Sequence, residues 1–498
     1  MERILYVPFD HLHRDYGVLR EADPSRDVVL FVESERMLRA HRWHRQRVWF
    51  LVSAARHFAE NLRNAGYVVM YERAASTVDG ISAARDRYTG ATVWSAEPSS
   101  FRMTADLHGA GVQFIPNDFF LTGRSEFAAW AGSQKSLVME NFYRAQRKRL
   151  GILVDGDQPT GGTWNHDADN RLPPPRDHTY PAYLEHAPDE TDAQVLADLE
   201  AMGLDLWGAA PGTAWATTRA GALQQLRHFL EHRFANFGPY EDAMTHENWQ
   251  AYHSLLSPYL NVGLIHPEEV IDAVRERFRR GDVPIASCEG FVRQLIGWRE
   301  YVNGLYWYFG RDYRESNGLA AERPLLPLFE DPQCTRMHCV RSIVQDVQDR
   351  SWVHHIPRLM VLSNLALIAG VNPQEFLQWM RERFIDAADW VMVPNVIGMG
   401  VHADDGRMMT KPYAAGGAYI SRMSTYCKGC VYDPKKRVGD TACPFTTLYW
   451  DFLARHREHF AGNHRIAQQL HGLDRLSDLT DVREQAVELL QGLERGVV

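Results

Sequence analysis

Four of the six cysteines have the residue types and spacing of a metal site. Cys427 and Cys430 form a CxxC pair, Cys443 follows after a short loop and precedes a proline, and Cys339 lies far upstream beside His338. A CxxC pair places two thiolates on one small loop where both face the same ion, in zinc and iron-sulfur sites alike. The pattern therefore predicts a metal centre.

Spacing alone leaves the metal open. Zinc would take all four thiolates, or three of them with His338, whereas a 4Fe-4S cluster, which we favour, would take the four thiolates. Four unrelated buried cysteines are the remaining interpretation, but a CxxC pair with Cys-Pro a short loop away would then be a coincidence. Cys288 and Cys334 have no paired spacing, and we expect them to be small packing residues.

Two adjacent histidines could move a proton. His354 and His355 precede Pro357, which signals a helix start, and Arg358 follows. A histidine titrates near neutral pH and so can give or take a proton there. Adjacent helical residues diverge by about 100°. Only one of the two histidines can then point squarely at a given reaction centre.

The segment HSLLSPYL, residues 253–260, offers two hydroxyl groups near an expected helix start. The hydroxyls of Ser254 and Ser257 and the free amides of that helix start suit a phosphate group. The alternative is an ordinary helix N-cap. The C-terminal half is also rich in tryptophan, which fills helical cores by default but suits electron transfer beside a redox centre. These tryptophans are Trp298, Trp307, Trp352, Trp379, Trp390 and Trp450.

The first 125 residues alternate short apolar runs with amphipathic stretches. Runs such as ILYVPF, DVVLFVE and YVVMY are separated by helix-length segments, which predicts a Rossmann-like α/β domain with a doubly wound parallel sheet. A ligand of such a sheet binds at the C-terminal ends of its strands. Neither the glycine fingerprint of dinucleotide-binding folds nor a P-loop motif follows these strands.

Beyond this sheet we predict one basic helix from Phe127 to Leu153, then a long linker rich in Gly, Pro and Asp. From about residue 192 the apolar period becomes that of helices, which predicts a large all-α domain. The predicted parts are an α/β domain over 1–130, a helix and linker over 131–195, and an all-helical domain over 196–498.

Composition excludes several classes of protein. The chain has 498 residues, of which 45% are hydrophobic, and its apolar runs fall short of a membrane span. The start lacks the features of a secretory signal, so we expect a cytoplasmic protein. In a reducing compartment, clustered cysteines are more often metal ligands than disulfides. We also expect a monomer. The net charge of −9 gives no global attraction to nucleic acid, so DNA contact would need the basic patches at 144–151, 275–280 or 433–437.

Several long motifs occur in an order that is specific to one family. They are HSLLS, GFVRQLIGWREY (290–301), HHIPRLMVLSN (354–364), DWVMVPNVIGM (389–399), TKPYAAGG (410–417) and YCKGC with ACPF and LYWDFLARHRE after it. In these motifs the chain closely resembles the prokaryotic iron-sulfur branch of the photolyase and cryptochrome family. The resemblance extends to VSAARHFAENLRNAGY near the start and GGTWNHDADNR in the linker.

The resemblance implies a light-dependent DNA photolyase that reverses pyrimidine (6-4) pyrimidone photoproducts by electron transfer from excited reduced FAD. It implies a U-shaped FAD and a 4Fe-4S cluster on the four cysteines in the helical domain. It also implies a 6,7-dimethyl-8-ribityllumazine antenna in the α/β domain, with Leu51 as an apolar contact. The partner would be UV-damaged DNA whose lesion flips out of the stack into the flavin pocket.

The resemblance also assigns roles to individual residues. His355, with His354 beside it, would donate or relay a proton to the lesion. Arg358 and Asp386 would face the N5 and C4 oxygen region of the flavin, and Asn395 the flavin edge. The phosphates would be held by Ser254, Leu255, Leu256 and Ser257, and the lesion pocket would be lined by Trp298, Glu300 and Tyr413.

Two regions depart from that branch. Asp331 stands where relatives have a tryptophan of the chain that photoreduces the flavin, and Met380 replaces a common tyrosine beside the retained Trp379. We therefore expect electrons to reach the flavin slowly or through other residues. The PFDHL turn and residues 32–47 lack the groups that hold the lumazine in relatives, so we expect a weakly bound or different antenna.

Two other functions remain open. A cryptochrome-like blue-light photoreceptor would use the same cofactors to signal without repair, although the retained His354 and His355 favour repair. A helical DNA-binding module stabilised by zinc or a cluster would have no catalysis, and the flavin motifs count against it.

Overall fold

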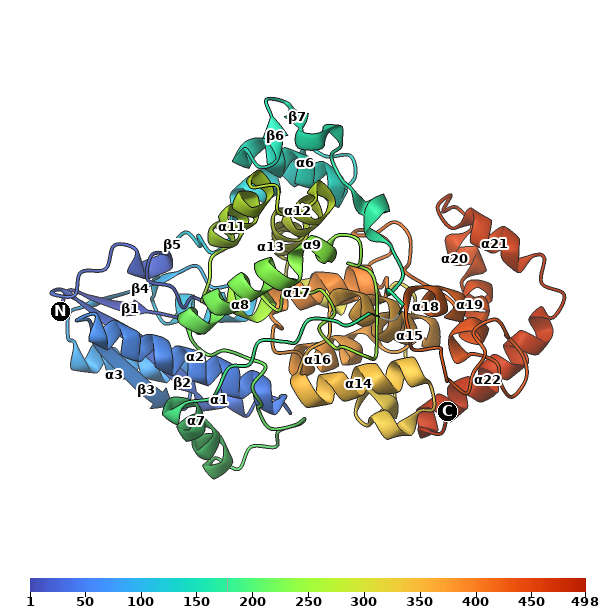
Figure 1. Ribbon diagram of the computed structural model, residues 1–498. Coiled ribbons are helices and arrows are strands. Elements are labelled where there is room, and N and C mark those ends of the chain that lie inside the picture. Colours follow the sequence, from blue (N-terminus) through green and yellow to red (C-terminus); the bar gives the residue numbers. More distant parts are fainter. Residues whose placement is uncertain (177) are drawn as a thin grey trace.

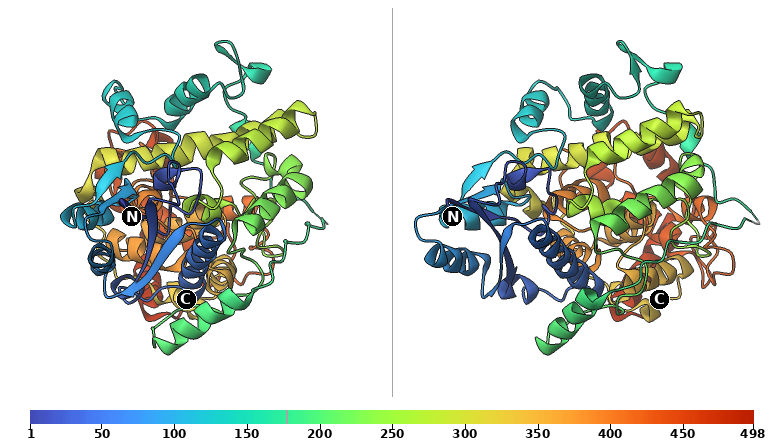
Figure 2. Two further views of the ribbon diagram at one scale, coloured as in Figure 1. Left: turned by 90° about the vertical axis from the view of Figure 1, so that its left-hand side faces the viewer. Right: turned by 60° about the vertical axis from the view of Figure 1, so that its left-hand side comes forward.

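A computed structural model of the protein describes residues 1–176 and 178–498. Asp177, within the predicted linker, lies outside the described residues. The N-terminal sheet and its helices lie beside a larger body of helices, which holds the C-terminus (Figure 1). Seen from the side of the sheet, the helical body lies behind it (Figure 2).

A five-stranded sheet forms the N-terminal part, in the order β3-β2-β1-β4-β5. Its strands are β1 (Arg3–Tyr6), β2 (Asp27–Ser34), β3 (Val68–Ala74), β4 (Thr92–Ala96) and β5 (Gln113–Ile115). All neighbouring pairs are parallel. Every residue of β2 is buried, as expected for an inner strand covered on both faces. The predicted doubly wound parallel sheet is confirmed.

Helices cover both faces of this sheet. They are α1 (Glu35–Leu38), α2 (Arg45–Asn64), α3 (Thr77–Arg87) and α4 (Phe101–Gly109). Successive residues of a strand point to opposite faces. Leu5 of β1 therefore packs in a cluster with α2, whereas Ile4 and Tyr6 pack in another with α3 and α4. The hydroxyls of Ser76 and Ser100 begin α3 and α4 by accepting a backbone N–H.

The prediction of one basic helix from Phe127 to Leu153 is wrong. The segment consists of α5 (Arg124–Gly132), α6 (Met139–Leu150) and a hairpin of β6 (Val154–Asp155) and β7 (Gln158–Pro159). Gly132 and Ser133 are weak helix formers, and α5 ends there. Gly151 ends α6 in the left-handed conformation, with φ of 64°.

The remaining described chain is mainly helical. Its first helices are α7 (Glu190–Ala201), α8 (Arg219–His232), α9 (Phe234–Phe237), α10 (Ser257–Asn261), α11 (Pro267–Arg279), α12 (Ile285–Val292), α13 (Glu300–Phe309) and α14 (His338–Arg350). The others are α15 (Asn364–Ala369), α16 (Pro373–Arg383), α17 (Asp389–Val393), α18 (Gly417–Met423), α19 (Pro444–Arg455), α20 (Arg457–Phe460), α21 (Ala467–Leu473) and α22 (Leu479–Arg495). Within the described residues, no helix is long and apolar enough to cross a membrane.

Among the residues that the structure describes, three stretches of the helical body are π-helical. They are Arg293–Arg299 between α12 and α13, Pro357–Ser363 before α15, and Pro394–Gly400 after α17. A β-carbon at Gly400 would lie 2.9 Å from the Ser363 hydroxyl, so the second and third stretches touch where one residue has no side chain. π-Helical turns are rare and occur frequently at functional sites. The space between these three stretches is therefore a candidate functional site.

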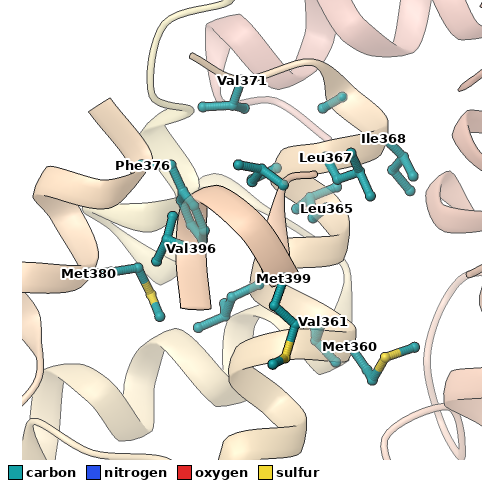
Figure 3. Close-up of a cluster of buried hydrophobic side chains, with 14 of the residues drawn as sticks. Met360, Val361, Leu365, Leu367, Ile368, Val371, Phe376, Met380, Val396 and Met399 are labelled. Atoms are coloured by element: carbon teal, nitrogen blue, oxygen red, sulfur yellow. The ribbon is translucent and has the colours of Figure 1, made fainter. Parts of the chain in front are cut away.

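The core of the helical body surrounds these stretches. Met360 and Met399, from two of them, lie in one buried cluster with Phe376 and Met380 of α16 (Figure 3). A second cluster joins the α2 face of the sheet to later helices, because Leu5 and α2 pack with residues of α8, α11 and α12. The proposed domain limits at residues 130 and 196 stay a prediction.

We predict that Gly304→Ala lowers the free energy of unfolding by about 1–3 kcal/mol, the usual cost of overpacking. A β-carbon at Gly304 of α13 would collide with the ring of Phe127 of α5, which is itself buried. Urea unfolding followed by circular dichroism measures the change.

The matched control is Gly132→Ala, because nothing lies within 4 Å of the added carbon. It should be neutral or stabilising by up to about 1 kcal/mol. Equal stability of the parent and Gly304→Ala would contradict the tight packing of α13 on α5.

Candidate functional site

A central cavity of about 1190 Å³ opens between the three π-helical stretches. Ligand pockets commonly measure roughly 300–1,000 Å³. Its wall includes Arg293, Trp298 and Arg299 from the first stretch, Arg358, Met360 and Ser363 from the second, and Asn395, Val396 and Met399 from the third. The size suits an extended ligand rather than a small metabolite.

A buried ion pair forms part of the cavity wall. The Arg358 guanidinium donates to both carboxylate oxygens of Asp386, at 2.9 and 3.0 Å. The same carboxylate accepts a hydrogen bond from the Ser257 hydroxyl at 2.6 Å, and the Asp386 carbonyl accepts one from the Asn261 amide at 2.8 Å. Bidentate, charge-assisted pairs of this kind fix geometry strongly. The pair therefore presents a rigid, polar edge to whatever occupies the cavity.

The HSLLS segment lies along the same wall, with Ser254, Leu255, Leu256 and Ser257 all among the lining residues. Leu255 has a φ of 59°, which is uncommon for a side chain with a β-carbon. The Ser254 hydroxyl accepts from the Leu256 amide at 3.3 Å. Strained backbone of this kind concentrates at functional sites. Neither serine is the N-cap of α10, because Leu256 holds that place.

The two predicted histidines meet at the cavity together with a third. His354 is buried and stacks on His253, with ring centroids 4.0 Å apart. His355 is open to the cavity, and ligand nitrogens of all three rings lie within 4.8 Å of one another. His354 Nδ1 and His253 Nε2 are buried without a hydrogen-bond partner in the described part of the chain. Unpaired buried nitrogens are costly, so these two call for a polar ligand or water.

The charges of these histidines are set mainly by burial. Burial, followed by the nearby His253, holds the pKa of His354 well below its usual value. Desolvation by the surrounding cavity wall, followed by Arg358 and Arg293, lowers the pKa of His355 to about 4. Both rings are therefore neutral at neutral pH until a negative charge enters the cavity.

Most of the other predicted residues also line this cavity. Trp298, Asn395 and Tyr413 are in its wall, and so is Met380, which was noted as a departure. Trp379 is buried behind the wall and donates its indole N–H to the Phe329 carbonyl at 3.0 Å. The cavity is thus assembled from segments that the sequence motifs identified separately.

Glu300 is a correction, because the structure turns it away from the cavity. Its carboxylate accepts from the Thr122 amide and from the neighbouring Arg299 guanidinium, both at 2.8 Å. Adjacent helical residues diverge by about 100°, so Arg299 faces the cavity and Glu300 faces the segment before α5. Leu51 is also remote from the cavity and packs half-buried against the cluster on the α2 face of the sheet.

An acidic and basic network completes the wall, and sequence reasoning gave it no role. Arg293 lies within 3.3 to 3.6 Å of carboxylates of Asp167, Glu241 and Glu289. Burial raises the pKa of Glu241 to about 8 and that of Asp242 to about 6. Arg293 stands inside the GFVRQLIGWREY motif, which is the only sequence signal that pointed to it. His253, the H of HSLLS, was missed in the same way.

The four predicted metal-binding cysteines meet at a second site. Cys339, Cys427, Cys430 and Cys443 line one small cavity, with Gly417 and aromatic residues around them. A β-carbon at Gly417 would lie 2.7 Å from the Cys443 sulfur, so only glycine leaves room there. His338 instead bonds the Tyr426 carbonyl at 2.7 Å and is absent from the lining. Burial, followed by the neighbouring thiols, raises the pKa of Cys427 to about 11.

Solved structures with the same arrangement define the class of fold. A bacterial class III photolyase from Agrobacterium tumefaciens matches with a TM-score of 0.58 at 15% identity, over 99% of this chain and 98% of that one. A cryptochrome from Synechocystis sp. PCC6803 matches with a TM-score of 0.55 at 14% identity, over 80% and 82% of the two chains. At these identities the matches establish the fold alone, which is that of photolyases and cryptochromes.

Sequence comparison then identifies the family. The family model described as deoxyribodipyrimidine photo-lyase-related protein matches residues 5–215. A protein of Agrobacterium fabrum named (6-4) photolyase is 40% identical over 510 residues, which cover 99% of this chain and all of that protein. The chain belongs to the photolyase and cryptochrome family.

The lowered histidine pKa values predict how stability depends on pH. His355, whose folded pKa is about 4, stays neutral in the folded protein while the same side chain in the unfolded chain takes up a proton below about pH 6.5. The contribution of the neutral ring to the free energy of unfolding is complete above about pH 6.5 and is lost as the pH falls toward 4. His355→Asn should therefore have a shallower loss of stability over this range, measured by urea unfolding. The exposed His108→Asn serves as control, and equal slopes for His355→Asn and the parent would refute the assignment.

Proposed function

We propose that this protein is a light-dependent DNA repair enzyme that reverses pyrimidine (6-4) pyrimidone photoproducts with reduced FAD. The central cavity carries the proposal, because it joins a histidine pair to a buried Arg-Asp pair in one space. The full-length similarity to a protein named (6-4) photolyase supports the same conclusion. His354, His355 and Tyr413 would act on the lesion.

The cavity wall fits FAD. Its volume of about 1190 Å³ admits a folded dinucleotide, and the unpaired nitrogens of His253 and His354 require polar partners. Arg358 and Asp386 would contact the N5 and C4 oxygen region, Asn395 the flavin edge, and residues 254–257 the phosphates. When bound in its reduced form, FAD supplies an electron to the lesion under light.

The histidines would supply the proton chemistry. The pKa of His355 is lowered to about 4, so its ring is neutral at neutral pH. An anionic lesion beside it would favour the protonated ring and so raise its pKa toward neutrality. His355 could then give its proton to the lesion and recover it, while stacking against His253 holds His354 in place.

The lesion would enter from the open side of the cavity. Chemistry on a stacked base requires that the base leave the duplex. The cavity wall includes the cations Arg171, Lys411, Arg422 and Arg465. These residues could hold the flanking phosphates, and Trp298 and Tyr413 would stack on the flipped base. Their positions support DNA binding despite the net charge of −9.

The cysteine site fits a 4Fe-4S cluster better than a single zinc ion. Four sulfurs around zinc would lie about 3.8 Å apart, given Zn–S bonds of about 2.3 Å. In the described residues, no three cysteine sulfurs lie within 4.8 Å of one another, whereas a trio of histidine nitrogens does. The wider spacing and the exclusion of His338 support a four-cysteine cluster.

Other expectations stay predictions. These are a monomeric state, a cytoplasmic location, and a lumazine antenna in contact with Leu51. A photoreceptor without repair is the second candidate function, because the Synechocystis cryptochrome shares the fold as well as the photolyase does. Repair of damaged DNA separates the two functions.

Blue light should make the purified, reduced protein remove (6-4) photoproducts from a damaged oligonucleotide, with no loss in darkness. His355→Ala should slow this repair at least roughly a hundredfold, the contribution of a general acid. Chromatography of the digested oligonucleotide measures the lesion.

The control variant for repair is His108→Asn, whose side chain is exposed on α4. It should repair at the parent rate. An oligonucleotide with a cyclobutane dimer tests lesion specificity. If the parent bound FAD but removed no (6-4) product under light, the photoreceptor function would replace repair.

Loss of one cluster ligand should reduce folding before it reduces chemistry. Cys443→Ala should lose iron and acid-labile sulfide together with its native circular dichroism, because structural metal binding contributes folding free energy. Cys334→Ala removes a thiol outside the cavity and should keep both. A well-folded, cluster-free Cys443→Ala protein with normal repair would contradict the structural role, and zinc without iron in the parent would contradict the cluster.

A further inference from the structure

Three tryptophans form a cluster that runs from the central cavity toward the surface. Trp352, Trp249 and Trp215 come from the segment after α14 and from two loops between α7 and α10. Trp352 is 5% exposed and lines the cavity, Trp215 is 2% exposed, and Trp249 is half-buried. The cluster thus has one end at the cavity and another at solvent.

Trp352 lies beside the polar edge of the cavity. Its indole N–H donates to the Ser257 hydroxyl at 3.4 Å, and that hydroxyl binds Asp386. The Arg358 guanidinium carbon lies 5.9 Å from the centre of its ring. Trp352 therefore neighbours the Arg-Asp pair that would face the flavin ring.

The other two tryptophans are in direct contact with Trp352. The ring centroids of Trp249 and Trp352 are 5.8 Å apart, and those of Trp215 and Trp352 are 6.3 Å apart. The guanidinium of Arg350 lies 5.3 Å from the centre of the Trp249 ring. Each of Trp352 and Trp249 therefore has one guanidinium near its ring.

The route that the family pattern would use is interrupted. Asp331 is an N-cap residue at the surface, where its carboxylate accepts from the Gln333 amide. The ring neighbours of Trp379 are Phe329, Phe376 and Phe384. Phenylalanine is far harder to oxidise than tryptophan or tyrosine, so these rings do not extend an electron path.

We propose that Trp352 and Trp249 carry single electrons from solvent to the ligand of the central cavity, and this route rests on the proposed binding of FAD. Under light, Trp352 gives one electron to the ligand and is oxidised, and Trp249 then reduces Trp352. A thiol in solution gives one electron to Trp249, and two such thiols end as a disulfide and two protons. Trp215 is buried and contacts both Trp249 and Trp352, with ring centroids 6.2 and 6.3 Å away, so an electron that passes through Trp215 still enters at Trp249.

Photoreduction of the full-length flavoprotein tests this route. The oxidised, FAD-loaded parent, Trp249→Phe, Trp249→Tyr and Trp379→Phe proteins are illuminated with dithiothreitol, and loss of the flavin absorbance is followed. Trp249→Phe should be slower by at least roughly tenfold, equal to about 1.4 kcal/mol of barrier. Trp249→Tyr should recover part of the rate, because a phenol can still be oxidised, and Trp379→Phe should match the parent. Transient absorption should detect the oxidised indole in the parent and lose its long-lived part in Trp249→Phe.

Repair by chemically reduced protein separates the route from the proposed function. Trp249 is not part of the cavity wall, so Trp249→Phe should repair at the parent rate once dithionite has reduced its flavin. A Trp249→Phe protein that photoreduces normally, or a Trp379→Phe protein that alone is slow, would overturn the route and leave repair standing. A parent that binds no FAD would overturn both.

Discussion

The pairing of Arg358 with Asp386 constrains how the helical body is assembled. A buried charge is costly unless a partner and hydrogen bonds compensate it. Arg358 belongs to a π-helical stretch and Asp386 to the turn between α16 and α17, so the pair exists only when these elements meet. Ser257 and Asn261 of α10 bind the same aspartate. One ion pair therefore holds together three segments that are far apart in the sequence.

The π-helical stretches explain how such a wall encloses a large space. Each shifts the hydrogen-bond pattern by one residue and so changes which side chains face inward over a single turn. The first stretch brings Arg299 to the cavity wall, where its guanidinium lies over the rings of Phe120 and Trp390. Regular helices at these places would present a different set of residues. The irregularity is thus part of the site and not a defect in the helices.

Much of the architecture could be predicted from the sequence. Alternating apolar runs predicted the parallel sheet, and the CxxC pair with Cys-Pro predicted that four cysteines meet. Predictions from local sequence patterns failed where the position of a side chain depends on a partner that is distant in the sequence. Glu300 was expected in the pocket, but its partner Thr122 lies far away in the chain. The role of His253 depends on its stacking with His354. The break between α5 and α6 depends on tertiary packing, which the spacing of apolar residues in the sequence does not reveal.

The cysteine site also has a consequence for the order in which the protein is made. Cys339 lies near the N-terminus of α14, whereas the other three cysteines of the site lie between α18 and α19. Contacts between residues so far apart in the sequence form late, because closing the long loop between them costs conformational entropy. Most of the helical body must therefore be synthesised before the four cysteines can meet. If the four cysteines bind the proposed cluster, its insertion must follow the synthesis of Cys443, the last of the four in the chain.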